Sequence, residues 1–303
     1  MIIKTKPNPK FPVSFSYLIR WIKAPINLFI YTLIYKSRKS TFVSLFKYFN
    51  FFARWMINVS FDKETNFLIA NDKKDKQLKL YLDKAGHLRQ YKNGISERLE
   101  KLNKDYFLEV INLNSKDLVI DIGANIGEVS LEIYRKYKCK ILCIEPESRE
   151  FECLKINLNK KSNVDFINKP LWKDIRSMTL YSNNDDLDSS LIFNGEKSEE
   201  ITKKTTTLGE IFIEKKIKKV KLLKLEAEGA EPEILLGSEG VLKNIEYICA
   251  DVGPERGVNF ETTLVDTTNI LLKHNFVLKK MNHPRLICLY QNMIFVDEKN
   301  GYK

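Results

Sequence analysis

Residues 118–127 constrain the fold more than any other stretch of the chain. Their sequence, LVIDIGANIG, is a short apolar run followed by small residues at alternate positions, and residues 128–138 then have a helical pattern. An apolar run bounded in this way predicts a buried parallel strand. A strand, a glycine-rich turn and a helix N-terminus together predict a nucleotide-binding turn, because glycine lets the backbone approach a ligand and present its N–H groups.

The residues around this turn discriminate between cofactors. A dinucleotide fingerprint needs G-x-G-x-x-G, whereas this turn reads D-x-G-x-N-x-G, with Asn125 at the middle position. Asparagine tolerates left-handed backbone, so the tight turn is kept. Asp121 would repel a pyrophosphate but suits the cationic S-adenosylmethionine, and Glu145 stands where a βαβ unit places its ribose-binding acid. An NAD-dependent oxidoreductase is therefore the disfavoured alternative.

A second acidic motif follows a later apolar strand. Residues 221–225 lead into Glu226, Glu228 lies in the next turn, and Glu231-Pro-Glu opens a helix at its positive end. Ligands of open α/β sheets bind beyond the carboxyl ends of the strands, so we expect five acids to meet there. They are Asp121, Glu145, Glu226, Glu228 and Asp251. Such a cluster predicts a cationic ligand, a metal or proton abstraction.

From residue 116 onward, strand and helix patterns alternate, which predicts an α/β fold with a mostly parallel sheet. Strands are predicted at 118–122, 141–145, 164–168, 221–226, 245–251, 275–281 and 286–296. Helices are predicted at 127–138, 148–160, 208–216, 231–243 and 261–274. Residues 172–207 are interpreted as a long loop, either functional or simply a solvated acidic segment.

Two further segments precede this domain. Residues 61–91 alternate polar and apolar positions and predict two or three antiparallel strands, and residues 95–111 predict a helix. Together they are expected to cap the cofactor end of the sheet. The chain is accordingly divided into residues 1–60, a small cap at 61–115 and a main domain at 116–303.

The net charge of +11 is concentrated at the N-terminus. Residues 1–60 hold 10 Lys or Arg and no Asp or Glu, whereas the rest of the chain holds 40 basic and 39 acidic residues. The main domain is thus nearly neutral, which argues against nucleic acid as a partner.

The same N-terminal segment is rich in aromatic residues. Residues 1–13 are predicted to form a loose arm, and the apolar run at 26–35 is too short to span a bilayer. Residues 41–58 predict a basic amphipathic helix, which favours peripheral membrane contact through residues 14–60. Packing on the main domain or on a second subunit is the alternative. The predicted apolar face consists of Phe42, Leu45, Phe46, Phe49, Phe52, Ala53 and Met56.

The five cysteines are odd in number and match no zinc spacing, so they are interpreted as reduced core residues of a cytoplasmic protein. No G-x-S-x-G motif is present, and a serine-hydrolase triad is unsupported.

Several motifs occur in an order that resembles the FkbM family of S-adenosylmethionine-dependent methyltransferases. They are VIDIGANIG at 119–127, IEP at 144–146, SSL at 189–191, TTL at 206–208 and KLEAEGAE at 224–231. The resemblance implies a seven-stranded Rossmann-like sheet with an antiparallel last strand. It also implies O-methylation of a hydroxyl on a sugar, a glycan precursor or a secondary metabolite. Carried onto this chain, Asp121, Gly123, Asn125 and Gly127 would line the cofactor, Glu145 would bind its ribose, and Glu226 would reach its methionine end.

Transfer to an alcohol requires an aligned acceptor and a group that takes its proton. The candidates are Glu228, Asp251 and Glu226, with His283 a weaker one because a surface turn is its expected place. The same acids would alternatively hold Mg²⁺ through oxygen ligands, although the sequence assigns no metal site. The family usually has Asp at the position of Glu226 and often an acid at that of Gly209. These departures keep a non-catalytic cofactor-binding or scaffold protein as the alternative.

Overall fold

The computed structural model describes residues 38–159, 161–182, 189–193, 195 and 199–296, and the chain forms two compact units, residues 1–55 and 56–303. In the first unit the described element is helix α2 (Lys39–Ala53). The arm predicted at 1–13 and the apolar run at 26–35 lie outside the described residues. The helix predicted at 41–58 ends at Ala53, because Arg54 adopts a left-handed conformation and the Asn50 side chain accepts the Trp55 N–H.

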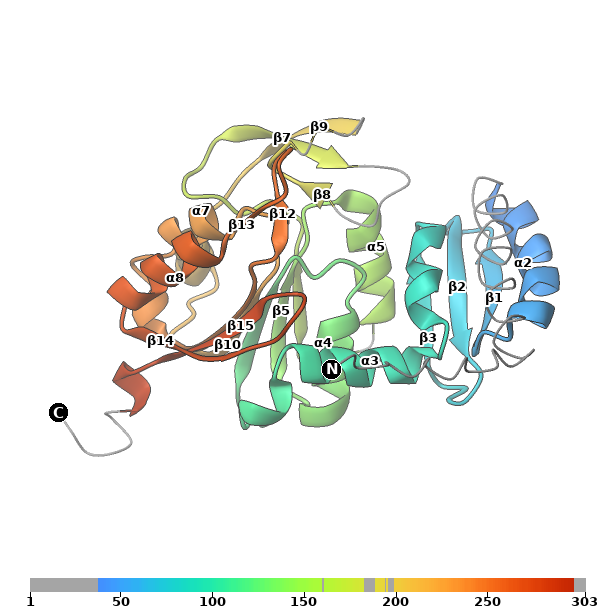
Figure 1. The fold of residues 1–303 in the computed structure, drawn as a ribbon, viewed down its shortest axis with the longest axis horizontal. Coiled ribbons are helices and arrows are strands. Elements are labelled where there is room, and N and C mark those ends of the chain that lie inside the picture. The colour runs from blue at the N-terminus through green and yellow to red at the C-terminus, as the bar shows by residue number, and fades with distance from the viewer. Residues whose placement is uncertain (1–37, 160, 183–188, 194, 196–198, 297–303) are drawn as a thin grey trace, which may run out of the picture. The chain divides into compact units, whose positions relative to one another are not determined.

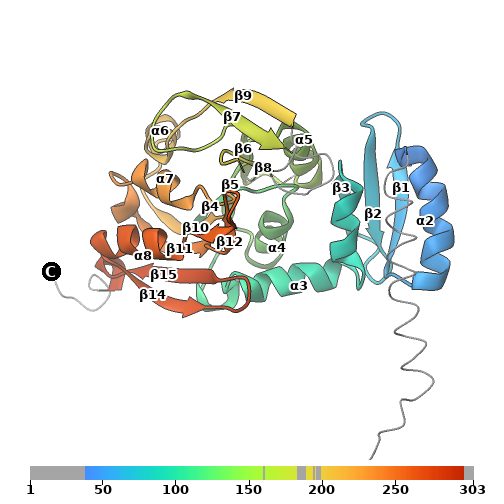
Figure 2. The same ribbon diagram turned by 45° about the horizontal axis from the view of Figure 1, so that its top comes forward.

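The second unit is built on a seven-stranded sheet with the order β14-β15-β11-β10-β4-β5-β6 (Figure 1 and Figure 2). Neighbouring strands are parallel, except that β15 is antiparallel to both β11 and β14. The strands are β4 (Leu118–Ile122), β5 (Lys140–Ile144), β6 (Val164–Ile167), β10 (Val220–Leu225), β11 (Ile245–Asp251), β14 (Phe276–Met281) and β15 (Ile287–Asn292). This topology confirms the expected Rossmann-like sheet with an antiparallel last strand.

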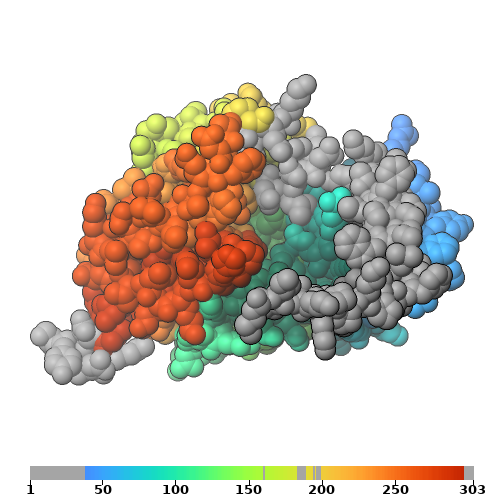
Figure 3. Space-filling view, viewed as in Figure 1, coloured from blue at the N-terminus to red at the C-terminus, as the bar shows by residue number. Residues whose placement is uncertain are grey.

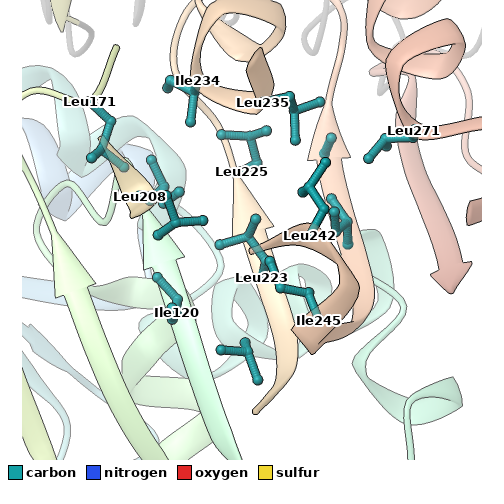
Figure 4. Packing of buried hydrophobic residues seen from close by; sticks show 14 of the residues in the cluster. Ile120, Leu171, Leu208, Leu223, Leu225, Ile234, Leu235, Leu242, Ile245 and Leu271 are labelled. Atoms are coloured by element: carbon teal, nitrogen blue, oxygen red, sulfur yellow. The ribbon is translucent and has the colours of Figure 1, made fainter. Parts of the chain in front are cut away.

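Helices cover both faces of this sheet. They are α3 (Ile95–Asp105), α4 (Glu128–Tyr137), α5 (Ser148–Asn157), α6 (Leu208–Glu214), α7 (Glu231–Leu236) and α8 (Leu264–Lys273). Alternate residues of a strand point to opposite faces. Ile120 and Leu223 therefore share one face, where they pack with α6, α7 and α8 in a single buried cluster (Figure 4). Asp121 faces the other way and accepts a hydrogen bond from Ser130 of α4.

A smaller antiparallel sheet precedes the main one, as the alternating pattern of residues 61–91 predicts. Its strands are β1 (Ile57–Asp62), β2 (Phe67–Asp72) and β3 (Lys79–Leu82), followed by the 3₁₀ helix η1 (Ala85–Tyr91). The helix predicted at 95–111 is α3 followed by the short 3₁₀ helix η2 (Leu108–Val110), because Phe107 between them is left-handed.

The prediction of a structureless loop at 172–207 is wrong for the residues that are described. They form an antiparallel sheet of β7 (Ser177–Ser182), β8 (Ser189–Ser190) and β9 (Glu199–Lys204), which lies beyond the carboxyl ends of the main strands (Figure 2). A third small pairing joins β12 (Pro254–Arg256) to β13 (Glu261–Thr262). Asp185, Asp186 and Asp188 of the acidic stretch lie outside the described residues.

The helix predicted at 231–243 is also shorter than expected. Helix α7 ends at Leu236, and the 3₁₀ helix η3 (Leu242–Asn244) follows separately. Gly237 interrupts the helix where the chain passes close to Trp172, whose carbonyl oxygen would lie 2.4 Å from a Cβ atom at this position. In Figure 3 the orange and red atoms, which belong to the C-terminal part of the chain, form one continuous surface.

All five cysteines are buried and free of disulfides, as expected of core residues. Among the described residues, every helix is too short or too polar to cross a membrane.

Candidate active site

A cavity of about 310 Å³ lies at the carboxyl ends of β4, β5 and β10. Its walls come from the strand-end turns, from η1 and α3 of the cap, and from the segment around β8. The charged lining residues are five carboxylates against three Lys or Arg side chains. The carboxylates are those of Glu128, Glu145, Glu226, Glu228 and Glu255, and the cations are those of Arg98, Lys169 and Arg285. This excess of acid favours a cationic ligand.

The turn after β4 has the backbone that its sequence predicts. Gly123, Asn125 and Gly127 all have positive φ, at 68°, 48° and 92°. A Cβ atom on Gly123 would lie 1.8 Å from the carbonyl oxygen of Glu226, so this position excludes any side chain. Gly123 and Asn125 both line the cavity, whereas Gly127 lies behind it, against Leu154 of α5.

Glu145 stands at the end of β5 with its carboxylate held by the backbone. It accepts hydrogen bonds from the N–H groups of Asn125 (2.7 Å) and Glu147 (2.8 Å), and the residue is only 4% exposed. Burial raises the pKa of Glu145 to about 7, against the opposing effect of these two hydrogen bonds. A fixed carboxylate at this edge can accept hydrogen bonds from the two hydroxyl groups of a ribose.

Asp121 lies directly behind the cavity and is not among its lining residues. It is fully buried, and its carboxylate lies 3.1 Å from Nζ of Lys224, opposite it in the β4–β10 register. Lys224 also contacts the Glu226 carboxylate at 3.0 Å and donates to the carbonyl of Gly123 at 2.7 Å. Asp121 therefore supports the turn through Lys224, which sequence reasoning did not single out. The sequence signal that could have identified Lys224 is the occurrence of a lysine within an apolar strand.

Glu226 is held by groups from three separate elements. It accepts a hydrogen bond from the Tyr106 hydroxyl (2.6 Å) and pairs with Arg285 (2.6 Å) as well as Lys224. Burial alone would raise the pKa of Glu226, but Lys224 and Arg285 outweigh it and lower this pKa to about 2. Glu226 thus remains a carboxylate and is a poor proton acceptor. The extra methylene relative to aspartate is accommodated by these partners.

Asp251, at the end of β11, pairs with the same guanidinium as Glu226. Its second oxygen accepts the Gly253 N–H, and the residue is buried without lining the cavity. In the described part of the chain, no three His, Cys, Asp or Glu side chains are arranged to hold a metal ion. His283 is exposed and Gly209 lies in the first turn of α6, so both stand outside the cavity lining.

Two carboxylates at the cavity remain as candidate proton acceptors. Glu228 was expected, and it lines the cavity from a turn in which its φ is 50°. The buried Glu231 shapes this turn by accepting the N–H groups of Ala227 and Gly229, while Ser190 donates to the Glu228 carbonyl.

Glu255 of β12 also lines the cavity but was missed by sequence reasoning, which considered Asp251 at the end of the preceding strand and not the connection beyond it. Burial, and then the negative charges of Asp251 and Glu226, raise the pKa of Glu255 to about 8.

The wall that the cap contributes is polar and incompletely hydrogen-bonded. His87, Gln90 and Arg98 line it, with Arg98 paired to Glu128 at 3.2 Å. Within the described residues, Nδ1 of His87 and the side-chain oxygen of Gln90 are buried without a hydrogen-bond partner, whereas Nε2 of His87 lies 3.5 Å from a carboxylate oxygen of Glu150. Buried polar atoms are almost always satisfied, so this wall has capacity for a bound polar group.

The sheet order, with its antiparallel last strand, and the strand-end cavity define a Rossmann-like α/β fold with a candidate ligand site. The chain belongs to the FkbM family of methyltransferases, since the model of the methyltransferase FkbM domain matches residues 121–281, more than half of the sequence. A search of curated proteins found no match.

Solved structures give several weak similarities. A precorrin-6y methyltransferase from Geobacter metallireducens is 13% identical, with 64% of this chain and 85% of that chain covered and a TM-score of 0.37. A magnesium protoporphyrin IX methyltransferase from Synechocystis PCC 6803, solved with bound S-adenosylhomocysteine, is 10% identical, with 67% and 86% covered and a TM-score of 0.41.

Proposed function

We propose that this protein is an S-adenosylmethionine-dependent O-methyltransferase that acts on a hydroxyl of a sugar, a glycan precursor or a secondary metabolite. The observation that supports it most strongly is the cavity at the strand ends. There a glycine-rich turn, the buried carboxylate of Glu145 and an excess of acid occur together. The cysteine content of the chain fits a cytoplasmic location.

The lining residues fit this cofactor. The cavity of about 310 Å³ is at the lower end of the range for small-molecule sites, roughly 300–1,000 Å³. Glu145 would hold the ribose, the turn at Gly123 would lie against the cofactor, and the acidic lining would favour its positive charge. When bound, the cofactor supplies an activated methyl group. The same acids would repel the pyrophosphate of NAD.

The remaining residues that line the cavity would bind the methyl acceptor and take up its proton. Glu228 and Glu255 line the cavity and are the carboxylates placed to take the proton of a hydroxyl. A cation in the cavity lowers the pKa of a nearby carboxyl, so cofactor binding would shift Glu255 towards the charged form that accepts a proton. The cap wall offers the His87 and Arg98 donors beside the Gln90 acceptor, which suits hydroxyl groups because these both donate and accept.

The test of the O-methyl assignment is an acceptor screen with methyl-labelled S-adenosylmethionine against sugars, nucleotide sugars and hydroxylated metabolites. We expect label on a hydroxyl oxygen, identified from the carbon chemical shift of the new methyl group. Label on carbon or nitrogen would contradict the assignment. Cofactor binding without turnover on any acceptor would instead favour the non-catalytic alternative.

The affinity for S-adenosylmethionine should rise with pH through neutrality. The Glu145 pKa of about 7 means that its charged fraction grows from about one tenth at pH 6 to about nine tenths at pH 8. If the ribose hydroxyls bind the charged form, the association constant increases roughly tenfold over this range. Titration calorimetry at several pH values measures it.

The Glu145→Gln variant is the control for this pH dependence, because the amide keeps an acceptor oxygen and does not titrate. We expect its affinity to be lower and its pH profile flatter than that of the parent protein. An unchanged profile would assign the pH dependence to the cofactor or to another group.

A further inference from the structure

Helix α2 has two aromatic faces with different environments. Phe42, Phe46 and Phe49 are buried, and their rings form a chain of contacts that ends on Trp55. Centroid distances in this chain are 5.3–5.8 Å. This face of the helix is therefore occupied by packing and is not available to a partner.

The other face carries large apolar side chains in water. Tyr48, Phe51 and Phe52 are 75–77% exposed, and Leu45 is 40% exposed. Leu45, Tyr48 and Phe52 follow the i, i+3, i+7 spacing of a single helix face, with Phe51 one turn from Tyr48. The prediction that Leu45 and Phe52 share one face with Phe42 and Phe46 is wrong, because exposure separates them. Single exposed apolar residues are ordinary, but a cluster of this kind marks an interaction site.

The charge of the first unit indicates which kind of partner this face of α2 contacts. All 10 Lys and Arg residues of positions 1–60 lie within residues 1–55, which contain no Asp or Glu, so the first unit carries +10 of the chain's net +11. Arg38, Lys47 and Arg54 of this unit are exposed around α2. Two copies of such a unit repel each other, which disfavours self-association through this face. An anionic lipid surface attracts such a unit, because each basic residue near the surface gains favourable electrostatic energy.

We infer that the face of α2 formed by Leu45, Tyr48, Phe51 and Phe52 inserts into the interface of an anionic membrane. The aromatic rings enter the boundary between headgroups and acyl chains, as in other interfacial helices with a basic polar face. The basic residues around the helix bind the anionic headgroups. The contact is peripheral, and it is independent of the methyltransferase proposal because neither the cavity nor any residue at it takes part.

The experiment is flotation of the full chain with two kinds of vesicle, phosphatidylcholine alone and phosphatidylcholine with about one third phosphatidylserine, at low and high salt. We expect the parent protein to bind the phosphatidylserine vesicles more strongly and to lose binding as salt screens the charges. The triple variant Tyr48→Ser, Phe51→Ser, Phe52→Ser should lose at least about tenfold in affinity, because it removes the apolar surface that the three rings would bury in the membrane interface.

A matched control removes equally exposed apolar side chains from the other unit. Ile213 of α6 and Val265 of α8 are 73% and 66% exposed, and the double variant Ile213→Ser, Val265→Ser should bind vesicles like the parent. Lys47→Glu should weaken binding to phosphatidylserine vesicles only. The inference is overturned if the parent protein binds neither vesicle, or if the triple variant floats as the parent does. It is also overturned if the control loses as much binding, or if the parent is a dimer that the triple variant dissociates without any vesicle binding.

Discussion

Replacing Gly123 by alanine is expected to lower the free energy of unfolding by at least about 3 kcal/mol and to abolish binding of S-adenosylmethionine. The new Cβ atom would lie 1.8 Å from the backbone oxygen of Glu226, and backbone cannot move aside as a flexible side chain can. The positive φ of 68° adds a cost of about 1–2 kcal/mol for a residue with a side chain. Urea unfolding monitored by circular dichroism measures the stability change.

Gly257→Ala is the control that separates the cost of the steric clash from the cost of the positive φ. Gly257 has nearly the same φ, 66°, but no heavy atom lies within 4 Å of its would-be Cβ atom. We expect this variant to lose only the cost of the backbone conformation, about 1–2 kcal/mol, and to keep cofactor binding. If the two variants lost the same small amount, the close packing of the Gly123 turn against Glu226 would be contradicted.

Replacing Lys224 by methionine should destabilise the protein by about 3–5 kcal/mol, because it leaves the buried Asp121 without its cation and weakens the hold on Glu226. The substitution also removes a donor to the Gly123 carbonyl, so cofactor affinity should fall in whatever protein remains folded. Urea unfolding and cofactor titration of the same preparation measure both effects.

Lys279→Met is the matched control, since Lys279 is exposed on β14 and its loss should change stability by no more than about 0.5 kcal/mol. Adding Asp121→Asn to Lys224→Met removes the uncompensated charge and should recover part of the lost stability. If the double variant lost more free energy of unfolding than the two single variants lose together, the Asp121–Lys224 pair would not be the source of the effect.

The central strands and the turn were predictable because their signals are local. Residues 118–122 and 245–251 form strands with the bounds that their apolar runs predict, and the left-handed positions of the turn follow from Gly123 and Asn125. The role of Asp121 could not be predicted from local sequence in the same way. Its neighbour Lys224 is fixed by the register between β4 and β10, and register depends on the packed sheet rather than on the sequence around either residue.

Other features depended on connections that sequence patterns describe poorly. Arg285 and Glu255 reach the cavity from the connections that follow β14 and β11, and both lie beyond the strand-end residues to which sequence reasoning was confined. Strands β7 and β9 have mixed, mostly polar sequences, so the insert was predicted as a loop. The faces of α2 were confused because aromatic residues occur on both, and only exposure distinguishes Phe46 from Phe52.

The measurement that tests the central claim most directly is calorimetric titration of the parent protein with S-adenosylmethionine, with NAD in parallel and Glu145→Gln as the comparison. We expect one site for S-adenosylmethionine, weaker binding by the variant at pH 8 and no binding of NAD. The buried Asp121 is unsuitable for this comparison, because its replacement would disturb Lys224 and the fold. Absence of S-adenosylmethionine binding by the folded parent protein, or equal binding of NAD, would contradict the assignment of the strand-end cavity as the site for this cofactor.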